Sequence, residues 1–413
     1  MLTFPSILPP LRPQNFAHSD GKSTVFENDN ASVSAAARRD LQECAQPVLK
    51  KKKPQETLPQ LHTASKQPTI DPRDYSLGKV IGKGHFSSVA KITLNSNEEM
   101  QLVVKMSKGP KFNESIEHEA SILKQLNKID REERVIKWYA EFKVDGCAWS
   151  IIEQITEDLA SYLKRHNPSL SSILTIMDQT SCAVAFLAEN GFVHGDLKPE
   201  NIGIKGTAKG RRICLLDFGL SFHTGALPPP YKSFGTLAYT APEAICSAIT
   251  TTPAEEKYIE FRNKQMTPNI DIWALGVIAA EMYSGQHFID DKELPPIPEA
   301  PGTQNKVQHL FLQVLMVIAK NVEPIPATLF DQGHLFADRL SLREDYLNPQ
   351  TPPKPLIRAA KKAKEELLSS GDFGLDYQIK QFIKDTLRVD PEMRLKDPLK
   401  HPLFHLKVVK PKP

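Results

Sequence analysis

The sequence contains few cysteines, and they form no motif. Only five of its 413 residues are cysteines, and no two of them are spaced as Cys-x-x-Cys. An odd number of scattered cysteines is typical of reduced thiols and argues against a disulfide framework or a zinc site. We therefore expect a cytoplasmic or nuclear location. The five are Cys44, Cys147, Cys182, Cys214 and Cys246.

Long apolar runs and an excess of charge of one sign are missing as well. The longest apolar candidate, Leu310 to Ala319, falls short of the roughly 20 residues that a membrane helix needs. No basic region precedes the first apolar residues, and Pro5, Pro9 and Pro10 interrupt them, so we expect no signal peptide. A net charge of +3 gives no reason to expect nucleic acid or a lipid surface as a partner.

The composition changes along the chain. Residues 1–72 contain nine prolines and the lysine run Lys50 to Lys53, and they hold too little apolar surface to offset the entropy of ordering. We expect a disordered tail there. The lysine run indicates either a patch for nuclear import or acidic partners, or simply a solvated run of charge.

Polar residues with a shared chemistry gather in one stretch. Val193 to Asn201 reads Val-His-Gly-Asp-Leu-Lys-Pro-Glu-Asn, and Asp217-Phe218-Gly219 follows sixteen residues later. Phosphoryl transfer from ATP needs a carboxylate to accept the hydroxyl proton, oxygen ligands for Mg²⁺, and a cation to neutralise developing charge. Each motif alone is weak, but together at this spacing they predict phosphoryl transfer. The residues that supply these groups are Asp196, Lys198, Asn201 and Asp217.

Two features nearer the amino terminus fit the same reaction. Gly82 and Gly84 follow an expected strand, Ser76 to Ile81, and such glycines let a turn approach phosphates, although a lone Gly-x-Gly also occurs in ordinary hairpins. Gln101 to Met106 is typical of a buried strand, and a lysine there is costly unless it is paired or reaches solvent. That lysine is Lys105.

A helix with a possible partner for this lysine follows. Phe112 to Asn127 has helical periodicity, which places its apolar residues on one face. Further on, Val135 to Tyr139 and Cys147 to Ile152 are typical of strands, and Ser172 to Asn190 of a long helix. The glutamates that the first helix offers are Glu114, Glu117 and Glu119.

With these motifs the chain resembles a eukaryotic-type protein kinase of the Ser/Thr kind, from about Tyr75 to about His405. The resemblance implies an α+β, bilobal fold with a small antiparallel-sheet lobe and a larger helical lobe. It implies a kinase domain over 73–405, with an N-lobe over 73–156 and a C-lobe over 157–405. Inserts are expected at 244–270 and 286–378, and a tail at 406–413. The stretch from Leu310 to Phe330 resembles the insert of the group that includes the dual-specificity and homeodomain-interacting kinases.

The resemblance also assigns roles. Asp196 would be the catalytic base, Lys198 would stabilise the transferred phosphoryl group, and Asn201 and Asp217 would bind Mg²⁺. Glu119 matches the family spacing of the partner of Lys105, and Glu117 is the alternative. The hinge, Glu153 to Glu157, would meet the adenine edge. The residues expected to bind ATP are Ile81, Gly82, Gly84, Val89, Lys105, Glu119, Glu153 and Ile155.

The activation segment is expected from Asp217 to Glu243. By the resemblance, Thr240 would bond to Asp196 and Lys198, and Glu243 would pair with Arg394. Asp271 would hold the backbone of the catalytic loop, Val193 to Asn201. A second Asp-Phe-Gly, at Asp372 to Gly374, has no strand before it, and we expect a coincidental turn there. We expect the 244–270 stretch to form a loop.

Gly195 stands where many kinases place an arginine that binds a phosphate on the activation segment. Without that side chain, we expect activity without phosphorylation of the segment. Lys91 and Arg211 are alternative cations that could replace it.

Two other classes of function remain open. A pseudokinase would act as a nucleotide-binding scaffold, but such proteins usually lose a catalytic lysine or aspartate, and none is lost here. A small-molecule phosphotransferase shares the catalytic residues but lacks the substrate loop seen at Gly235 to Glu243. We therefore expect an enzyme that transfers phosphate from ATP to protein Ser/Thr, with no nucleic acid partner; the sequence does not indicate an oligomeric state.

Overall fold

The computed structural model describes residues 75–84, 86–95, 97–166, 168–207, 210–226, 235–249, 266–289, 306–323, 325, 329 and 373–405. The expected tails at 1–72 and 406–413 and most of both expected inserts lie outside these residues. Lys50 to Lys53 also lie outside them.

The N-lobe is a five-stranded antiparallel sheet with the order β1-β2-β3-β5-β4. Alternating apolar residues build it, and one face buries a small core that includes Ala90, Ile92, Leu102, Val104 and Ile151. The strand expected at Val135 to Tyr139 was misplaced: β4 begins at Trp138, and Val135 makes only an isolated bridge to Leu215. The strands are β1 (Tyr75–Lys83), β2 (Ser87–Leu94), β3 (Asn97–Ser107), β4 (Trp138–Val144) and β5 (Cys147–Glu153).

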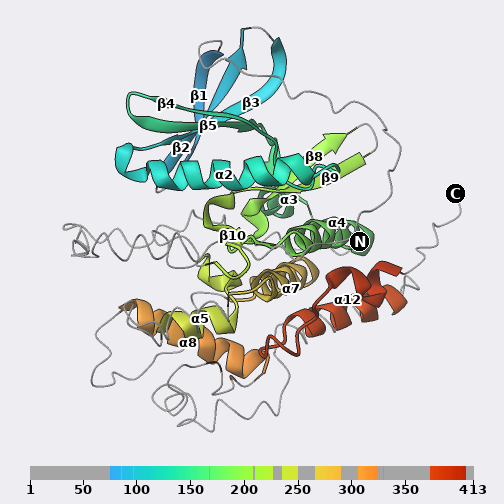
Figure 1. Cartoon of the computed structure of the whole chain (residues 1–413). Helices are drawn as coiled ribbons and strands as arrows, with labels where there is room; N and C mark the ends of the chain where they lie inside the picture. Colours follow the sequence, from blue (N-terminus) through green and yellow to red (C-terminus); the bar gives the residue numbers. More distant parts are fainter. Residues whose placement is uncertain are drawn as a thin grey trace, which may run out of the picture. The chain divides into compact units, whose positions relative to one another are not determined.

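Helix α2 (Asn113–Ile129) lies against this sheet, as Figure 1 shows. Its buried face carries the expected apolar residues, together with Glu119. Side chains at both ends fasten it to the sheet lobe, because Asn113 Oδ1 accepts the Ala148 N–H at 2.7 Å and Asn127 Oδ1 accepts the Trp138 N–H at 2.7 Å. A 3₁₀ turn, η1 (Pro110–Phe112), precedes the helix.

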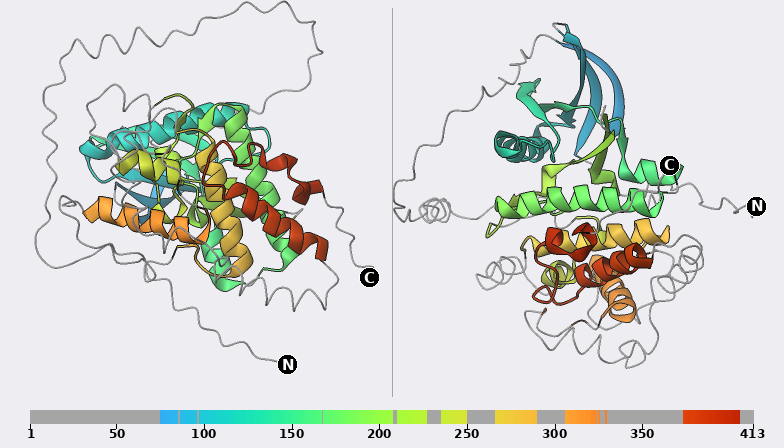
Figure 2. Two further views of the ribbon diagram at one scale, coloured as in Figure 1. Left: turned by 90° about the horizontal axis from the view of Figure 1, so that it is seen from below. Right: turned by 90° about the vertical axis from the view of Figure 1, so that its right-hand side faces the viewer.

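The C-lobe is built around α7 (Asn269–Ser284), which is buried on all sides from Ile270 to Met282. A helix that is apolar around its whole circumference belongs in the middle of a core. In the right-hand view of Figure 2, α4 (Leu170–Glu189) and α12 (Phe373–Thr386) lie on either side of α7, and both contact it. The other C-lobe helices are α3 (Leu159–Arg165), α5 (Pro242–Ile249) and α8 (Lys306–Asn321).

By length and composition alone, α4 could cross a membrane. It instead contributes buried residues such as Met177 and Leu187 to the C-lobe core. We therefore assign it as the core helix that leads to the catalytic loop.

Short elements connect the two lobes. A three-stranded sheet has the order β6-β8-β9, and β7 pairs with β10. The hairpin expected after Asn201 is present as β8 and β9. The bounds are β6 (Glu157–Asp158), β7 (Phe192–Val193), β8 (Ile202–Thr207), β9 (Gly210–Leu215), β10 (Phe222–His223), η2 (Pro199–Asn201), η3 (Phe218–Leu220), η4 (Leu237–Tyr239), η7 (Pro398–Lys400) and η8 (Pro402–His405).

Two expectations for the C-lobe were wrong. We expected a loop after Glu243, but α5 continues through this stretch as far as Ile249. The second Asp-Phe-Gly does not form an isolated turn. Phe373 and Gly374 begin α12, and the apolar face of this helix packs on α7. Asp372 itself lies outside the described residues.

Candidate active site

Asp271, in the first turn of α7, anchors the backbone of the catalytic loop. This carboxylate is 2% exposed and accepts the backbone N–H groups of His194, at 2.6 Å, and Gly195, at 3.0 Å. Burial raises its pKa, and the bonds to these N–H groups oppose the rise. The expected tie between Asp271 and the catalytic loop is therefore present.

His194 is fully buried and orders the same loop from the other side. Its Nε2 donates to the Leu216 carbonyl at 2.9 Å, and its Nδ1 accepts the Asp196 N–H at 3.3 Å. Both bonds together select the neutral tautomer with the proton on Nε2. His194 thus sets the backbone direction just before Asp196.

The Asp196 carboxylate is surrounded by donors. Its Oδ2 lies 3.0 Å from Lys198 Nζ and 3.1 Å from Asn201 Nδ2, and Asn201 Nδ2 also reaches the Asp196 carbonyl at 2.7 Å. These donors fix the direction of the carboxylate, which a proton acceptor requires.

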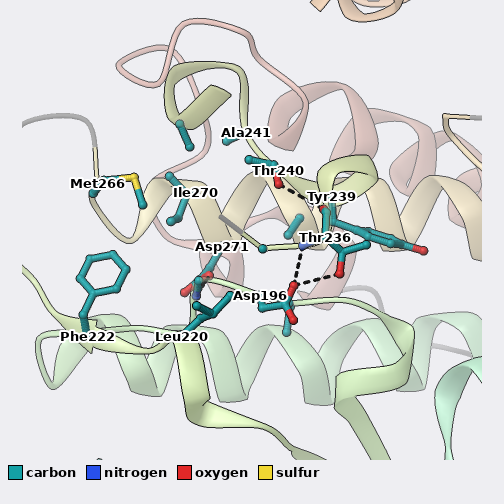
Figure 3. Close-up of a pocket in the computed structure, with 15 residues that line it drawn as sticks. Asp196, Leu220, Phe222, Thr236, Tyr239, Thr240, Ala241, Met266, Ile270 and Asp271 are labelled. Carbon is teal, nitrogen blue, oxygen red and sulfur yellow. Dashed lines mark hydrogen bonds between the residues drawn. The ribbon is translucent and has the colours of Figure 1, made fainter. Parts of the chain in front are cut away.

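Thr236, not Thr240, contacts this carboxylate. The Thr236 N–H and hydroxyl donate to Asp196 Oδ1 at 2.7 and 3.0 Å, and Lys198 Nζ donates to the Thr236 hydroxyl at 2.6 Å. Figure 3 shows the two side chains facing each other. The Thr240 hydroxyl instead donates to the Thr236 carbonyl at 3.1 Å, so the role expected for Thr240 was assigned to the wrong threonine.

Gly235 explains this difference. A Cβ at Gly235 would lie 2.6 Å from the Gly195 carbonyl and 2.8 Å from Asp196 Oδ1. Because only a glycine allows such an approach, the residue after it is brought to the catalytic loop. The signal for Thr236 was therefore in the sequence, as the Gly-Thr pair.

A small cavity of about 30 Å³ lies beside this contact, between the catalytic loop, the activation segment and α7 (Figure 3). It could hold one or two water molecules and is too small for a nucleotide. Its lining includes Leu220, Phe222, Met266 and Ile270.

Lys105 reaches from the sheet to two carboxylates. Its Nζ lies 2.6 Å from Glu119 Oε2 on α2 and 2.9 Å from Asp217 Oδ1. Burial alone would lower its pKa, but the charges of Asp217 and Glu119 outweigh this and raise the pKa. Lys105 is therefore a permanent cation. Glu117, the alternative partner, lies 2.9 Å from Lys143 on the surface instead.

Asp217 and Asn201 are the candidate metal ligands. Asp217 has a φ of 56°, an uncommon conformation for a residue with a side chain, and such backbone strain concentrates at functional sites. Because the amide nitrogen of Asn201 faces Asp196, its amide oxygen is available to a cation. Among the described residues, no three His, Cys, Asp or Glu side chains gather at a metal-like spacing. Two protein ligands suit Mg²⁺, which completes its shell with phosphate oxygens and water.

The strand register aligns the residues expected to bind ATP. Gly82 pairs with Val89, and Val89 pairs with Lys105, so the three follow one line across β1, β2 and β3. Ile81, which is 48% exposed, precedes this line, and Gly84 donates its N–H to the Ser87 carbonyl at 2.8 Å.

The expected hinge begins where β5 ends. Glu153 pairs with Lys205 of β8 at 2.5 Å. Within the described part of the chain, no hydrogen bond uses the backbone N–H or C=O of Ile155. Both groups are therefore available to the edge of a base, which presents a donor and an acceptor.

A buried ion pair holds the carboxyl end of the activation segment. Arg394 donates to both carboxylate oxygens of Glu243, at 2.6 and 2.9 Å, and both side chains are completely buried. Arg394 also donates to the Asn269 carbonyl at 2.8 Å. This pair, expected from the sequence, fixes the segment to α7.

The molecule is similar to a protein kinase in three respects: its sheet lobe, its helical lobe and its site residues. The site combines the Lys105–Glu119 pair with the cluster around Asp196. The comparisons agree: a family model described as the protein kinase domain matches residues 75–404. The chain therefore belongs to the protein kinase family.

Similar proteins are also named as kinases. The chain is 27% identical to the serine/threonine-protein kinase MAK of Mus musculus over 341 residues, covering 80% of this chain and 46% of the relative. It is 26% identical to the serine/threonine-protein kinase ICK of Mus musculus over 338 residues, covering 80% and 45%. It spans about half the length of these relatives.

A third relative bears on the kinase group. The chain is 27% identical to homeodomain-interacting protein kinase 1 of Mus musculus over 217 residues, covering 51% of this chain and 16% of the relative. The expected likeness to the group with homeodomain-interacting kinases is thereby confirmed. These names give the pseudokinase alternative no support.

Proposed function

We propose that the protein transfers the γ-phosphoryl group of ATP to serine and threonine hydroxyls of protein substrates. The observation that carries the proposal is the convergence of Asp196, Lys198 and Asn201 in one hydrogen-bonded cluster. Lys105 and Asp217, from two further segments, form a second cluster.

Asp196 accepts the proton of the substrate hydroxyl. Its carboxylate is already oriented by Thr236 and Asn201, so it needs no reorganisation when the substrate arrives. Lys198, 3.0 Å from the carboxylate, supplies positive charge where the transferred group becomes more negative.

Lys105 orients the α- and β-phosphates. Its ammonium group is held by the carboxylate of Glu119, a residue that is 3% exposed. Gly82 and Gly84 let the β1–β2 turn cover the phosphates, and Ile155 offers its backbone groups to the adenine.

Asn201 and Asp217 fit a magnesium ion. A carboxylate and an amide oxygen are the hard ligands that Mg²⁺ prefers. When bound, the ion would neutralise phosphate charge. Asp217 also lies 2.9 Å from the Lys105 ammonium group, so its carboxylate would contact both the lysine and the ion.

The preference for serine and threonine rests on two observations. Lys198 lies in Leu-Lys-Pro-Glu-Asn, the pattern of the Ser/Thr kinds, and two of the relatives are named serine/threonine-protein kinases. Tyrosine-specific members usually carry a different pattern.

The test is phosphate transfer from ATP to a basic protein, followed by phosphoamino-acid analysis. Asp196→Asn and Asp217→Asn should each lower transfer at least roughly 100-fold, with the product on serine and threonine only. Asp372→Asn, in the second Asp-Phe-Gly, is the matched control and should stay within about twofold. Equal transfer by wild type and Asp196→Asn would refute the proposal.

A further inference from the structure

Helix α2 holds the segment after Asp217 at three points. Glu119 Oε1 accepts the Phe218 N–H at 3.2 Å. One residue earlier on the helix, His118 Nε2 lies 2.6 Å from the Ser221 carbonyl oxygen. Two turns later, Gln125 Oε1 lies 3.2 Å from His223 Nε2. The first contact belongs to the lysine pair already described, but the second and third have no part in the expected site.

The His118 contact is a directed hydrogen bond. A carbonyl oxygen only accepts, so Nε2 must carry a proton.

This bond continues into the catalytic loop. Ser221 is fully buried, and its hydroxyl donates to the His194 carbonyl at 2.9 Å. His194 in turn accepts the Asp196 N–H through Nδ1. The side chain of His118 is therefore linked to the backbone of the catalytic aspartate through Ser221 and His194.

The helix itself is a fixed platform for this link. Asn113 and Asn127 hold its two ends to the sheet lobe, and Ile122, Leu123 and Leu126 are part of the larger hydrophobic core. A hydrogen bond from a rigid element positions its acceptor better than one from a loop.

We propose that His118 is a positioning residue for phosphoryl transfer: it fixes the main chain at Ser221, and thereby Phe218 to His223 and the catalytic loop, in the arrangement that the reaction needs. The inference rests on the proposed function. His118 acts through Ser221, and the proposal gives it no contact with substrate or nucleotide.

The experiment compares three replacements of His118. Gln places an N–H donor the same number of bonds from Cα as Nε2, Asn carries the same amide one bond short, and Phe keeps the ring without a donor. The matched control is Glu117→Gln, one residue away, whose partner Lys143 lies at the surface. Steady-state transfer to a peptide and amide hydrogen exchange of residues 218–223 are measured, with thermal melts to confirm folding.

His118→Phe and His118→Asn should lower kcat about tenfold with KM for ATP within twofold, and His118→Gln should recover at least half of the loss. Exchange at 218–223 should rise at least fivefold in Phe and Asn and stay near wild type in Gln and in the control. If the Phe variant does not fold, the comparison of Gln with Asn decides.

A kcat within twofold of wild type in the Asn variant, equal losses in Gln and Asn, or unchanged exchange at 218–223 would overturn the proposal. Because the exchange measurement does not depend on phosphate transfer, it still tests the positioning role if the wild-type protein transfers no phosphate. In that case the proposed function fails on its own.

Discussion

Two glycines allow the activation segment and the catalytic loop to meet. Gly195 has a φ of 79°, and a Cβ there would lie 2.9 Å from the Leu220 carbonyl oxygen. Gly235 faces the Gly195 carbonyl from the other side. The backbone around Asp196 is therefore packed more closely than any side chain at these two positions would permit.

Comparing alanine replacements of Gly195 and Gly191 separates the effect of backbone strain from the effect of close packing. Gly195→Ala should lower the free energy of unfolding by about 1–3 kcal/mol and reduce activity at least tenfold, because the loop must shift away from Leu220. Gly191→Ala is the control: its φ of 75° is nearly the same, but nothing lies within 4 Å. Urea unfolding and peptide phosphorylation measure both effects. Gly191→Ala should lose about 1 kcal/mol and keep its activity; equal activity losses in the two variants would contradict the packing argument.

The two threonines of the substrate loop provide a second matched pair. Thr236→Val removes a hydroxyl that both Asp196 and Lys198 contact, so kcat should fall at least about tenfold. Thr240→Val removes a hydroxyl bonded only to the Thr236 carbonyl and should change kcat less than threefold. Kinetics on one peptide at saturating ATP decides between them. A larger loss in Thr240→Val would restore the assignment made from the sequence.

At the residue scale, a charged side chain that needs a partner of opposite charge was predictable from the sequence. A lysine in an apolar strand needs a carboxylate. Of the three glutamates on the expected helix, the family spacing favoured Glu119, with Glu117 as the alternative. Glu119 lies on the buried face and contacts Lys105. Thr236 was missed because the family resemblance gave the role to Thr240, and the close approach to the catalytic loop that Gly235 allows was overlooked. His118 was missed because a polar residue on a helix gives no local signal for a distant carbonyl.

At the element scale, α7 organises the C-lobe. It carries Asp271 to the catalytic loop, and its first residue, Asn269, offers its carbonyl to Arg394. Arg394 then holds Glu243 at the start of α5. One buried helix thus positions both the catalytic loop and the carboxyl end of the activation segment.

The Glu243–Arg394 pair makes this testable. Arg394→Met would leave the Glu243 carboxylate buried without a partner, which should cost about 3–5 kcal/mol of folding stability. The double variant Glu243→Gln/Arg394→Met removes the stranded charge and should recover at least half of that loss. Urea unfolding of the wild type, both single variants and the double variant gives the coupling energy. Additive losses would mean that the pair is not the origin of the effect.

Elements with strong periodicity were predictable, and those set by distant pairing were not. The helix expected at Phe112 to Asn127 is α2, and the one expected at Ser172 to Asn190 is α4. Val135 looked like part of a strand, but its partner, Leu215, lies far away in the chain, and local pattern does not reveal such a bridge. The composition after Glu243 suggested a loop, whereas packing between α5 and α8 stabilises a helix.

At the scale of the whole molecule, direct hydrogen bonds tie the two ends of the activation segment to the sheet lobe and to the helical lobe. His118, Glu119 and Gln125 bind its first residues directly, and Arg394 binds its last. The Thr224 N–H donates to the Gly191 carbonyl at 2.8 Å, which adds a main-chain tie near the middle. The position from which an arginine would receive a phosphate is Gly195, which has no side chain.

We therefore expect activity without phosphorylation of the activation segment. Phosphatase-treated protein and the triple variant Thr224→Ala/Tyr231→Phe/Ser233→Ala should keep activity on a peptide within about threefold of untreated wild type, because direct bonds replace the phosphate-mediated contact. Tyr231 and Ser233 lie outside the described residues. Mass spectrometry confirms that no phosphate remains.

The alternative is that another cation receives a phosphate in place of the missing arginine. Arg211 is already engaged, since its guanidinium lies 4.8 Å from the centre of the Tyr162 ring and donates to the Tyr162 hydroxyl at 3.0 Å. Lys91, on β2, is exposed and remains the stronger candidate. A loss of more than about tenfold, roughly 1.4 kcal/mol of activation free energy, in both preparations would establish a phosphate switch. Lys91→Gln would then identify its receptor, because removal of the receptor should make the untreated enzyme as slow as the treated one.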